Sequence, residues 1–536
     1  MKTFSRYIFL LSGLLLLTES SAQIYNSWNH YPLNPVRRIM HRPGENFHSS
    51  VRPYRLDEVE KLYDTDSLVQ RGLPAPSGNE NIFGRFFHDD LLRWKNESST
   101  VRINPLFNFE TGHDSHTDDS WFINTRGAMV EGHLGENIGF YADIYENQAT
   151  FPGYIDEFAH KRNIVPGQGE RKKFGENGHD YAHSSGYLSY NAGRCFNLQL
   201  GFGKNFIGDG HRSLLLSDNA YSYPFLKMTA TFMKAKYMMM VAEFKDHNRL
   251  PETYGDTRYP NKYGALHYLN WNIGDRFSLG LFESVVWAPE DTVGYRGIDV
   301  NYLMPLVVFR PVEYNLGSPD NMTIGVNLKY IPWKDAAFYG QFVVGEFKHD
   351  EVFSGDKWWA NKHGFLAGTE VFNLFGVPHL DFQTEYSQVR PYTYSHYKSI
   401  TSYTHLYQEL AHPLGANFRE SISFLRYRLN RWHFELKHQY AVKGLNPDDE
   451  VNYGGNIHIP NQSRLGDYGH SIGQGLESTL SLTELNLIYL INPRNNMNIK
   501  MGARHRKMTN DQRTVNGNYF YFSFGTSLNN FYYDYF

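Results

Sequence analysis

The chain has 536 residues, of which 41% are hydrophobic and 16% aromatic, and its formal net charge is −4, from 52 basic and 56 acidic residues. Because it lacks an excess of Lys and Arg to neutralise phosphates, the sequence argues against a dedicated nucleic-acid binder. A single cysteine, Cys195, excludes a disulfide scaffold and cysteine-based redox or zinc sites. The 39 Tyr, 38 Phe and 46 Gly residues favour a large β-protein.

Residues 1–22 have the features of a secretory signal peptide. Lys2 and Arg6 precede and border an apolar stretch over 7–17, and the small residues at 20–22 form a cleavage site. We therefore expect an exported chain that begins at Gln23 and, with no cysteine near the cut, carries no lipid anchor. No later apolar run reaches the roughly 18 to 20 residues of a spanning helix, whereas a spanning strand needs only about 9 to 11. The sequence therefore excludes a helical membrane protein and allows a transmembrane barrel.

Residues 23–100 differ from the rest of the chain in their frequent prolines, at positions 32, 35, 43, 53, 74 and 76. One stretch, 56–69, has apolar residues near a 3.6-residue period and predicts a short amphipathic helix. We predict that 23–100 is an N-terminal segment that lies in the periplasm or plugs a barrel.

From residue 101 onward apolar and polar side chains alternate, as in strands with one apolar face. Trp432, Phe434 and Leu436, for example, alternate with His433 and Glu435. The alternation predicts eighteen strands near 101–110, 120–133, 136–148, 181–191, 194–205, 224–233, 236–246, 261–272, 276–288, 321–332, 336–347, 363–374, 378–389, 416–428, 431–442, 479–491, 495–508 and 517–528.

The connections between these strands alternate between short turns and long loops, the latter at 149–180, 206–223, 247–260, 289–320, 348–362, 390–415 and 443–478. An even strand number with short turns on one side is typical of a bacterial outer-membrane barrel with periplasmic termini. The predicted fold is thus an all-β, 18-stranded antiparallel transmembrane barrel over 101–536, in the outer membrane of a Gram-negative bacterium. The aromatic C-terminal run 531–536 is expected in the girdle at the membrane interface. A secreted soluble β-sandwich or propeller is the alternative.

Two loops exceed what a barrel scaffold needs. The first contains GDGHRSLLLSDNA over 208–220; three consecutive leucines are costly to expose, so we expect this loop to fold inward, as a structural plug or a ligand-contacting loop. The second, 301–322, is apolar in its first half and then carries Arg310 and Glu313. We expect it inside the lumen too, with Arg310 and Glu313 paired to each other or to lumen charges, because an unpaired buried charge is expensive.

Two histidine clusters offer metal-ligand types, His113 and His116 with Asp118 and Asp119, and a second one over 179–183. Both lie in or beside predicted loops, which favours solvated loops over metal sites. No GxSxG elbow is present, and adjacent carboxylates on a strand point to opposite faces. We therefore expect no enzyme activity, no metal and no cofactor.

With GDGHRSLLLSDNA and Pro224, the 302–321 segment including FRPVE, and FHSSVRPY over 47–54, the chain resembles the Wzi capsule-assembly family of outer-membrane proteins. It resembles more closely a Bacteroidetes branch that includes gliding-motility proteins of the RemB type. The resemblance implies an 18-stranded barrel with inward-folded loops that binds surface polysaccharide without catalysis and helps to attach or organise capsule.

The leading functional hypothesis is a lectin-like barrel whose partners are surface or capsular polysaccharide and membrane lipid. Its mouth would be shaped by loop residues, with hydrogen bonds from the polar group and charge complementarity from the arginines: Asp209, Arg212, Ser217, Asp218, Asn219, Arg310 and Glu313. The alternative is an accessory of a gliding-motility or protein-secretion apparatus that docks protein partners. A diffusion pore needs an open lumen, whereas the apolar stretches 214–216 and 302–309 predict occlusion.

Overall fold

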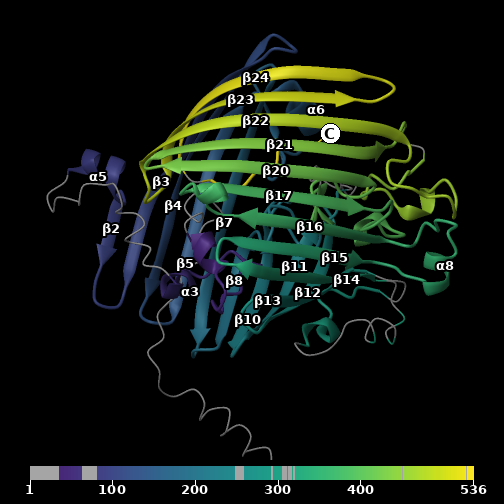
Figure 1. Cartoon of the computed structure of the whole chain (residues 1–536), viewed down its shortest axis with the longest axis horizontal. Helices are drawn as coiled ribbons and strands as arrows, with labels where there is room; N and C mark the ends of the chain where they lie inside the picture. Colours follow the sequence, from purple (N-terminus) through teal and green to yellow (C-terminus); the bar gives the residue numbers. More distant parts are fainter. Residues whose placement is uncertain are drawn as a thin grey trace, which may run out of the picture.

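The computed structural model describes residues 36–62, 81–247, 259–290, 294–304, 311, 315, 317, 320–448, 451–526 and 528–535. Eighteen antiparallel strands form a closed barrel (Figure 1). These strands are β3 (Thr100–Asp114), β4 (Asp119–Leu134), β5 (Ile138–Ala149), β7 (Gly178–Ala192), β8 (Phe196–Gly203), β10 (Tyr223–Phe232), β11 (Ala235–Lys245), β12 (Asn261–Ile273), β13 (Phe277–Trp287), β14 (Asn321–Trp333), β15 (Ala336–Val344), β16 (His363–Val371), β17 (Leu380–Val389), β20 (Phe418–Leu429), β21 (Trp432–Leu445), β22 (Leu476–Asn492), β23 (Met497–Thr509) and β24 (Thr514–Gly525). β24 pairs with β3 and closes the barrel, with Tyr519 opposite Asp114 and Gly525 opposite Asn108.

The strand predictions are confirmed: each of the eighteen predicted strands corresponds to one strand of the barrel wall. The largest boundary difference is at the end of β3, which continues to Asp114. β22 and β24 also begin earlier than predicted, at Leu476 and Thr514, because pairing continues into the loops. Short turns gather at one end of the barrel and long loops at the other. Two connections at the long-loop end, 115–118 and 510–513, are also short.

Short elements extend the wall and cross the loops. β2 (Leu92–Lys95) pairs with the start of β3, where β24 has already ended, and α5 (Ile82–His88) lies beside it at the short-turn end (Figure 1). The remaining elements are β1 (Val51–Arg52), α3 (Leu56–Leu62), α6 (Gly153–Arg162), β6 (Lys172–Phe174), β9 (Phe206–Ile207), η1 (Val300–Leu303), α8 (His349–Phe353), η2 (Leu374–Gly376), η3 (Ser399–Thr401), β18 (Thr404–His405), β19 (Gln408–Glu409) and η4 (Asn461–Ser463). Among the described residues, no helix is long and apolar enough to cross a membrane.

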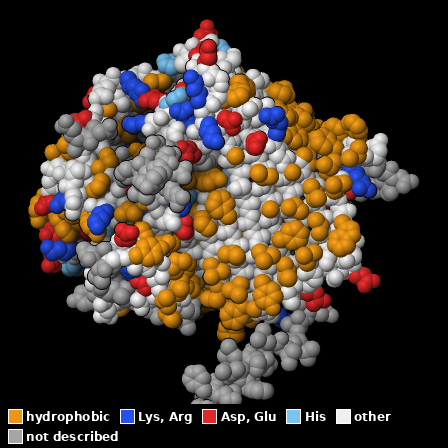
Figure 2. Space-filling view, turned by 180° about the vertical axis from the view of Figure 1, so that it is seen from behind, with side chains coloured by type: hydrophobic (Ala, Val, Ile, Leu, Met, Phe, Trp, Pro, Cys, Tyr) orange, Lys and Arg blue, Asp and Glu red, His pale blue; other side chains and the backbone are white. Residues whose placement is uncertain are grey.

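The two faces of the wall differ as the alternation requires. On β8, Leu198 and Leu200 are exposed on the outside, whereas Asn197 and Gln199 between them are buried in the lumen. Figure 2 shows hydrophobic side chains spread over much of the wall, with charged side chains gathered mainly toward the long-loop end. The outward-facing side chains are apolar, as suits contact with lipid. The inward-facing side chains are polar and need hydrogen-bond partners inside the barrel.

The lumen is filled by segments from distant parts of the chain, and the main hydrophobic core lies there rather than between layers of sheet. β1 of the N-terminal segment pairs with β9 of the 204–222 loop, antiparallel, with Val51 opposite Ile207. The following leucines, Leu214, Leu215 and Leu216, have no exposed surface and belong to this core. The prediction that this loop folds inward is therefore confirmed.

The C-terminal run occupies a different place from the expected one. Of the described residues 531–535, Tyr532, Asp534 and Tyr535 are buried, and Asp534 contacts Arg212 of the inward loop. The expectation that this run belongs to the aromatic girdle is wrong for these residues. The chain leaves the wall at Gly525 and turns into the lumen, where the pairing of Asp534 holds it.

Candidate functional site

Arg212 sits at the centre of a buried ion cluster. Its Nη2 lies 2.9 Å from Oε1 of Glu420 on β20 and 2.9 Å from Oδ2 of Asp534, and its Nε lies 3.1 Å from Oε2 of Glu420. His412 Nε2 lies 2.9 Å from the same carboxylate, and Lys437 Nζ contacts Asp534. Burial alone would raise the pKa of Asp534, but Arg212 and Lys437 hold that pKa well below its usual range. The cluster ties the inward loop, the C-terminal segment and the wall together.

Asp209 makes the corresponding connection to the N-terminal segment. Its carboxylate accepts hydrogen bonds from Ser49 Oγ at 2.5 Å and from Asn327 Nδ2 at 2.8 Å, and it lies 3.7 Å from Lys329 Nζ. Arg37 donates to its backbone carbonyl and to Glu370 of β16. The N-terminal segment, the loop and the wall strands β14 and β16 therefore share one polar network.

The Ser217, Asp218 and Asn219 side chains are also bonded within the protein. Ser217 Oγ donates to the carbonyl of Ala411, and Asn219 Nδ2 donates to that of Glu409 at 3.0 Å. Asp218 accepts from Tyr532 Oη at 2.7 Å and from Asn530 at 3.1 Å. All three residues are buried.

The structure thus brings Asp209, Arg212, Ser217, Asp218 and Asn219 together in the lumen. We call the N-terminal segment, the 204–222 loop and the C-terminal segment, which meet there, the plug. The five side chains hold the plug in place. Their assignment as sugar ligands stays a prediction. Arg310 and Glu313, the other two predicted site residues, lie outside the described residues. Within the same loop, Tyr302 is buried against Trp287, and Asp320 pairs with Arg296 at 2.9 Å.

A cavity of about 440 Å³ opens at the long-loop end, beyond this plug. One wall is α6, the floor is formed by the C-terminal segment, and the remaining walls come from strand ends and from the loops after β17 and β21. Six Phe and Tyr rings and five basic side chains line the cavity: Tyr154, Phe158, Tyr407, Tyr519, Tyr532 and Tyr535, with Lys161, Arg162, Lys443, Arg506 and Arg513. We call it the mouth pocket. Of the predicted site residues that the structure describes, only Asn219 lines it.

Arginines in the mouth pocket stack on its aromatic rings. The guanidinium of Arg506 lies 4.3 Å from the ring centre of Tyr154, and that of Arg162 lies 4.5 Å from Phe158. Arg162 Nη1 also donates to the carbonyl of Tyr407 at 2.7 Å and lies 3.4 Å from Glu409 Oε1. Burial raises the pKa of Glu409, but Arg162 and His458 outweigh it and lower that pKa to about 2. Flat rings and fixed cations therefore line one cavity.

A second cavity, of about 350 Å³, lies on the other side of the C-terminal segment. Phe531 and Tyr533 line this one, whereas Tyr532 and Tyr535 line the mouth pocket. Arg504 donates to the Tyr154 hydroxyl at 2.6 Å, and that hydroxyl donates to the Tyr533 carbonyl at 3.0 Å. The C-terminal segment, braced by Tyr154, separates the two cavities.

The histidine clusters have different surroundings. His116, Asp118 and Asp119 are exposed near the 115–118 turn, as expected of a solvated loop, although Asp114 beside them is buried. His179 and His183 lie on β7 and are buried, so the solvated-loop interpretation is wrong for the second cluster. The strand begins at Gly178, earlier than predicted, which turns both rings to its inward face.

No protein-family model matches the sequence, and no curated protein matches it. Among solved structures, the chain is similar to Wzi of Escherichia coli, described as an outer-membrane protein involved in group 1 capsule assembly and a carbohydrate-binding β-barrel, with a TM-score of 0.54 and 13% identity over 95% of this chain and 100% of Wzi. It is also similar to the outer-membrane protein OprD of Pseudomonas aeruginosa, with a TM-score of 0.44 and 11% identity over 81% of this chain and 95% of OprD. At these identities the likeness is one of fold: the chain is a closed outer-membrane-type β-barrel similar to Wzi.

Proposed function

We propose that the protein is a non-enzymatic barrel of the Gram-negative outer membrane that binds surface or capsular polysaccharide and assists capsule assembly or attachment. The observation that carries the proposal is the mouth pocket, where aromatic rings and basic side chains meet above a closed plug. Aromatic faces suit the apolar C–H faces of sugar rings, and Arg and Lys suit acidic groups on sugars. The similarity in fold to Wzi, a carbohydrate-binding β-barrel involved in group 1 capsule assembly, supports the same function.

The filled lumen supports binding rather than diffusion. The N-terminal segment, the 204–222 loop and the C-terminal segment meet in the lumen and share buried hydrogen bonds and ion pairs. A solute that crossed the barrel would have to displace these contacts. A ligand at the mouth pocket leaves them intact.

The test is binding of the purified, detergent-solubilised chain to the host's own capsular or surface polysaccharide. Phe158→Ala and Lys161→Ala remove a ring and an exposed charge from the mouth pocket. We expect saturable binding to wild type that weakens at least tenfold in the double variant, with an unchanged circular dichroism spectrum. Arg276→Ala, an exposed arginine in the 274–276 turn at the opposite end, is the matched control and should bind like wild type. Absence of saturable binding to wild type would sink the proposal.

The second candidate, a component of a gliding-motility or secretion apparatus, is favoured by one feature at the short-turn end. Ile82 and Phe83 of α5 and Trp94 of β2 are 61%, 71% and 54% exposed. Exposed apolar side chains of this kind suit a protein partner. If polysaccharide binding fails, a pull-down that is lost in Phe83→Ser and retained in Arg276→Ala would support this role. This second candidate function includes the proposal that the chain belongs to the RemB-type branch.

A further inference from the structure

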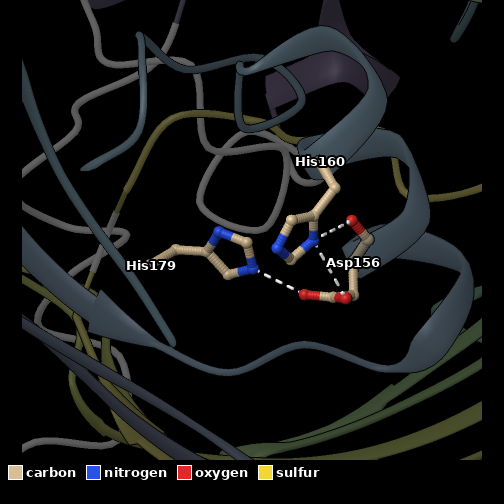
Figure 3. Close-up of side chains that lie close together, drawn as sticks. All are labelled: Asp156, His160 and His179. Carbon is tan, nitrogen blue, oxygen red and sulfur yellow. Dashed lines mark hydrogen bonds and ion pairs between the residues drawn. The ribbon is translucent and has the colours of Figure 1, made fainter. Parts of the chain in front are cut away.

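Two histidines and an aspartate converge where α6 packs on β7. Asp156 and His160 are four residues apart on α6 and therefore share one face of the helix. His179, near the start of β7, points toward this face (Figure 3). Asp156 Oδ1 lies 2.6 Å from His179 Nε2, and Asp156 Oδ2 lies 3.1 Å from His160 Nδ1. One ligand atom from each residue falls within 4.8 Å of the other two.

The group is rigid on one side and open on the other. His179 is completely buried, with its ring 5.2 Å from Phe151 and 5.0 Å from the His160 ring between centroids. The His160 side chain is 50% exposed and that of Asp156 is 35% exposed, so solvent reaches the remaining directions. Arg171 is a nearby cation, and its Nε donates to the carbonyl of Ala159 at 3.0 Å.

We propose that Asp156, His160 and His179 bind one divalent transition cation of the Zn²⁺ type, with water in the open positions. Imidazole nitrogens favour Zn²⁺, Co²⁺, Ni²⁺ and Cu²⁺, whereas Ca²⁺ and Mg²⁺ prefer oxygen-only sites. Bonds of about 2.0 to 2.2 Å to nitrogen and oxygen place ligand atoms roughly 3 Å apart around one ion. His160, which also contacts the Asp156 carbonyl at 3.0 Å, would give up that contact and turn its ring toward the ion.

The cation would cross-link α6 to the wall, across residues 163–177. The opposite face of α6 carries Tyr154, Phe158 and Arg162 into the mouth pocket. Metal binding therefore fixes one wall of that pocket from behind, although the metal site itself does not depend on any polysaccharide.

The experiment uses the untagged full chain in detergent, stripped with EDTA and titrated with Co²⁺ while its visible d–d absorption is recorded. We expect one equivalent of Co²⁺ to bind, with competition by Zn²⁺ and none by Mg²⁺ or Ca²⁺. His160→Gln, at a half-exposed position, should weaken Co²⁺ binding at least tenfold without changing the melting temperature of the metal-free protein. His179→Gln should have the same effect on binding, but its burial makes it a test of stability as well.

His116→Gln is the matched control, because His116 is an exposed histidine of the first cluster. It should bind Co²⁺ like wild type. Zn²⁺ should raise the melting temperature of wild type and of His116→Gln, but not of His160→Gln. A wild type without stoichiometric Co²⁺ binding, or a His160→Gln protein that binds as wild type does, would overturn the metal site and reduce the group to an ion pair with a buried histidine.

Discussion

The plug and the mouth pocket both contain arginines, carboxylates and tyrosines, but they use them differently. Where the plug meets the wall, Arg212, Glu420 and Asp534 have almost no exposed surface and pair with one another. At the rim of the mouth pocket, Arg513 and Glu157 form a pair whose side chains are 50% and 57% exposed. Buried pairs are costly to break but offer nothing to a ligand, whereas exposed pairs contribute little stability and can exchange partners. The comparison separates residues that close the barrel from residues that can recognise a ligand.

Removing the central arginine of the plug should have the largest effect. Arg212→Met leaves the carboxylates of Glu420 and Asp534 buried with fewer partners, so we expect a loss of about 3 to 5 kcal/mol in the free energy of unfolding. Arg212→Lys keeps the charge but loses the two-point contact with Glu420, and should lie between Arg212→Met and wild type. Thermal unfolding followed by circular dichroism measures both. A loss below about 1 kcal/mol for Arg212→Met would mean that the cluster does not hold the plug.

Substitutions in the apolar part of the plug should give the second-largest loss in the free energy of unfolding. Leu215 is fully buried, and its Cδ2 lies so close to Gly325 of β14 that a Cβ there would be 2.4 Å from it. Leu215→Ala should therefore lower the free energy of unfolding by about 3 kcal/mol through lost burial and a residual cavity. Leu226→Ala, at an outward position that is 54% exposed, is the control in the same detergent. Equal losses in both variants would contradict an inward plug core.

The loss of stability at low pH that Glu409 contributes should be smaller than the two effects above. The pKa of Glu409 is about 2 in the folded chain, below its ordinary 4.5, so its contribution is present above about pH 4.5 and is lost as the pH falls toward 2. Asp534, whose pKa is also held low, acts in the same direction. Glu409→Gln should lower stability by up to about 3 kcal/mol at pH 7 and flatten the fall between pH 4.5 and 2. Melting temperatures across that range check it, and an unchanged slope would exclude Glu409 as a contributor.

The smallest effect on stability is expected at the rim. Arg513→Gln breaks the pair with Glu157, and we expect a change of less than about 1 kcal/mol, because both side chains are half exposed. Its effect should appear instead in polysaccharide binding, as a weaker affinity and a reduced salt dependence. Titrations at two ionic strengths measure this, with Arg276→Gln as the control. Unchanged affinity and salt dependence would remove Arg513 from the recognition surface.

Local sequence patterns were enough to predict the strands of the barrel wall. Each strand has an apolar face and a polar face, and this two-residue period can be recognised within about ten residues of sequence. The three leucines at 214–216 were likewise enough to predict an inward loop, since exposing them would be costly. The resemblance to Wzi was confirmed at the level of fold.

Other features depend on contacts that local patterns do not contain. The aromatic run at 531–535 has the composition of a membrane girdle. Contacts with residues far away in the sequence hold it in the lumen, among them the pair of Asp534 with Arg212, 322 residues earlier. The mouth pocket likewise combines α6 with Tyr407 from the loop after β17 and with Arg506 and Arg513 from the β23–β24 hairpin.

The same limit applies to the candidate metal ligands. Asp156 and His160 carry no sequence signal of their own, and His179 lies at the end of the predicted loop 149–180, which favours a solvated position. Its short distance to α6 is set by the fold. The alternation of side chains was therefore enough to predict the wall, because the sequence of each strand shows which residues face outward and which face inward. The plug, the pocket and the convergence of Asp156, His160 and His179 were decided by tertiary structure, because closing the barrel is what brings those segments within bonding distance.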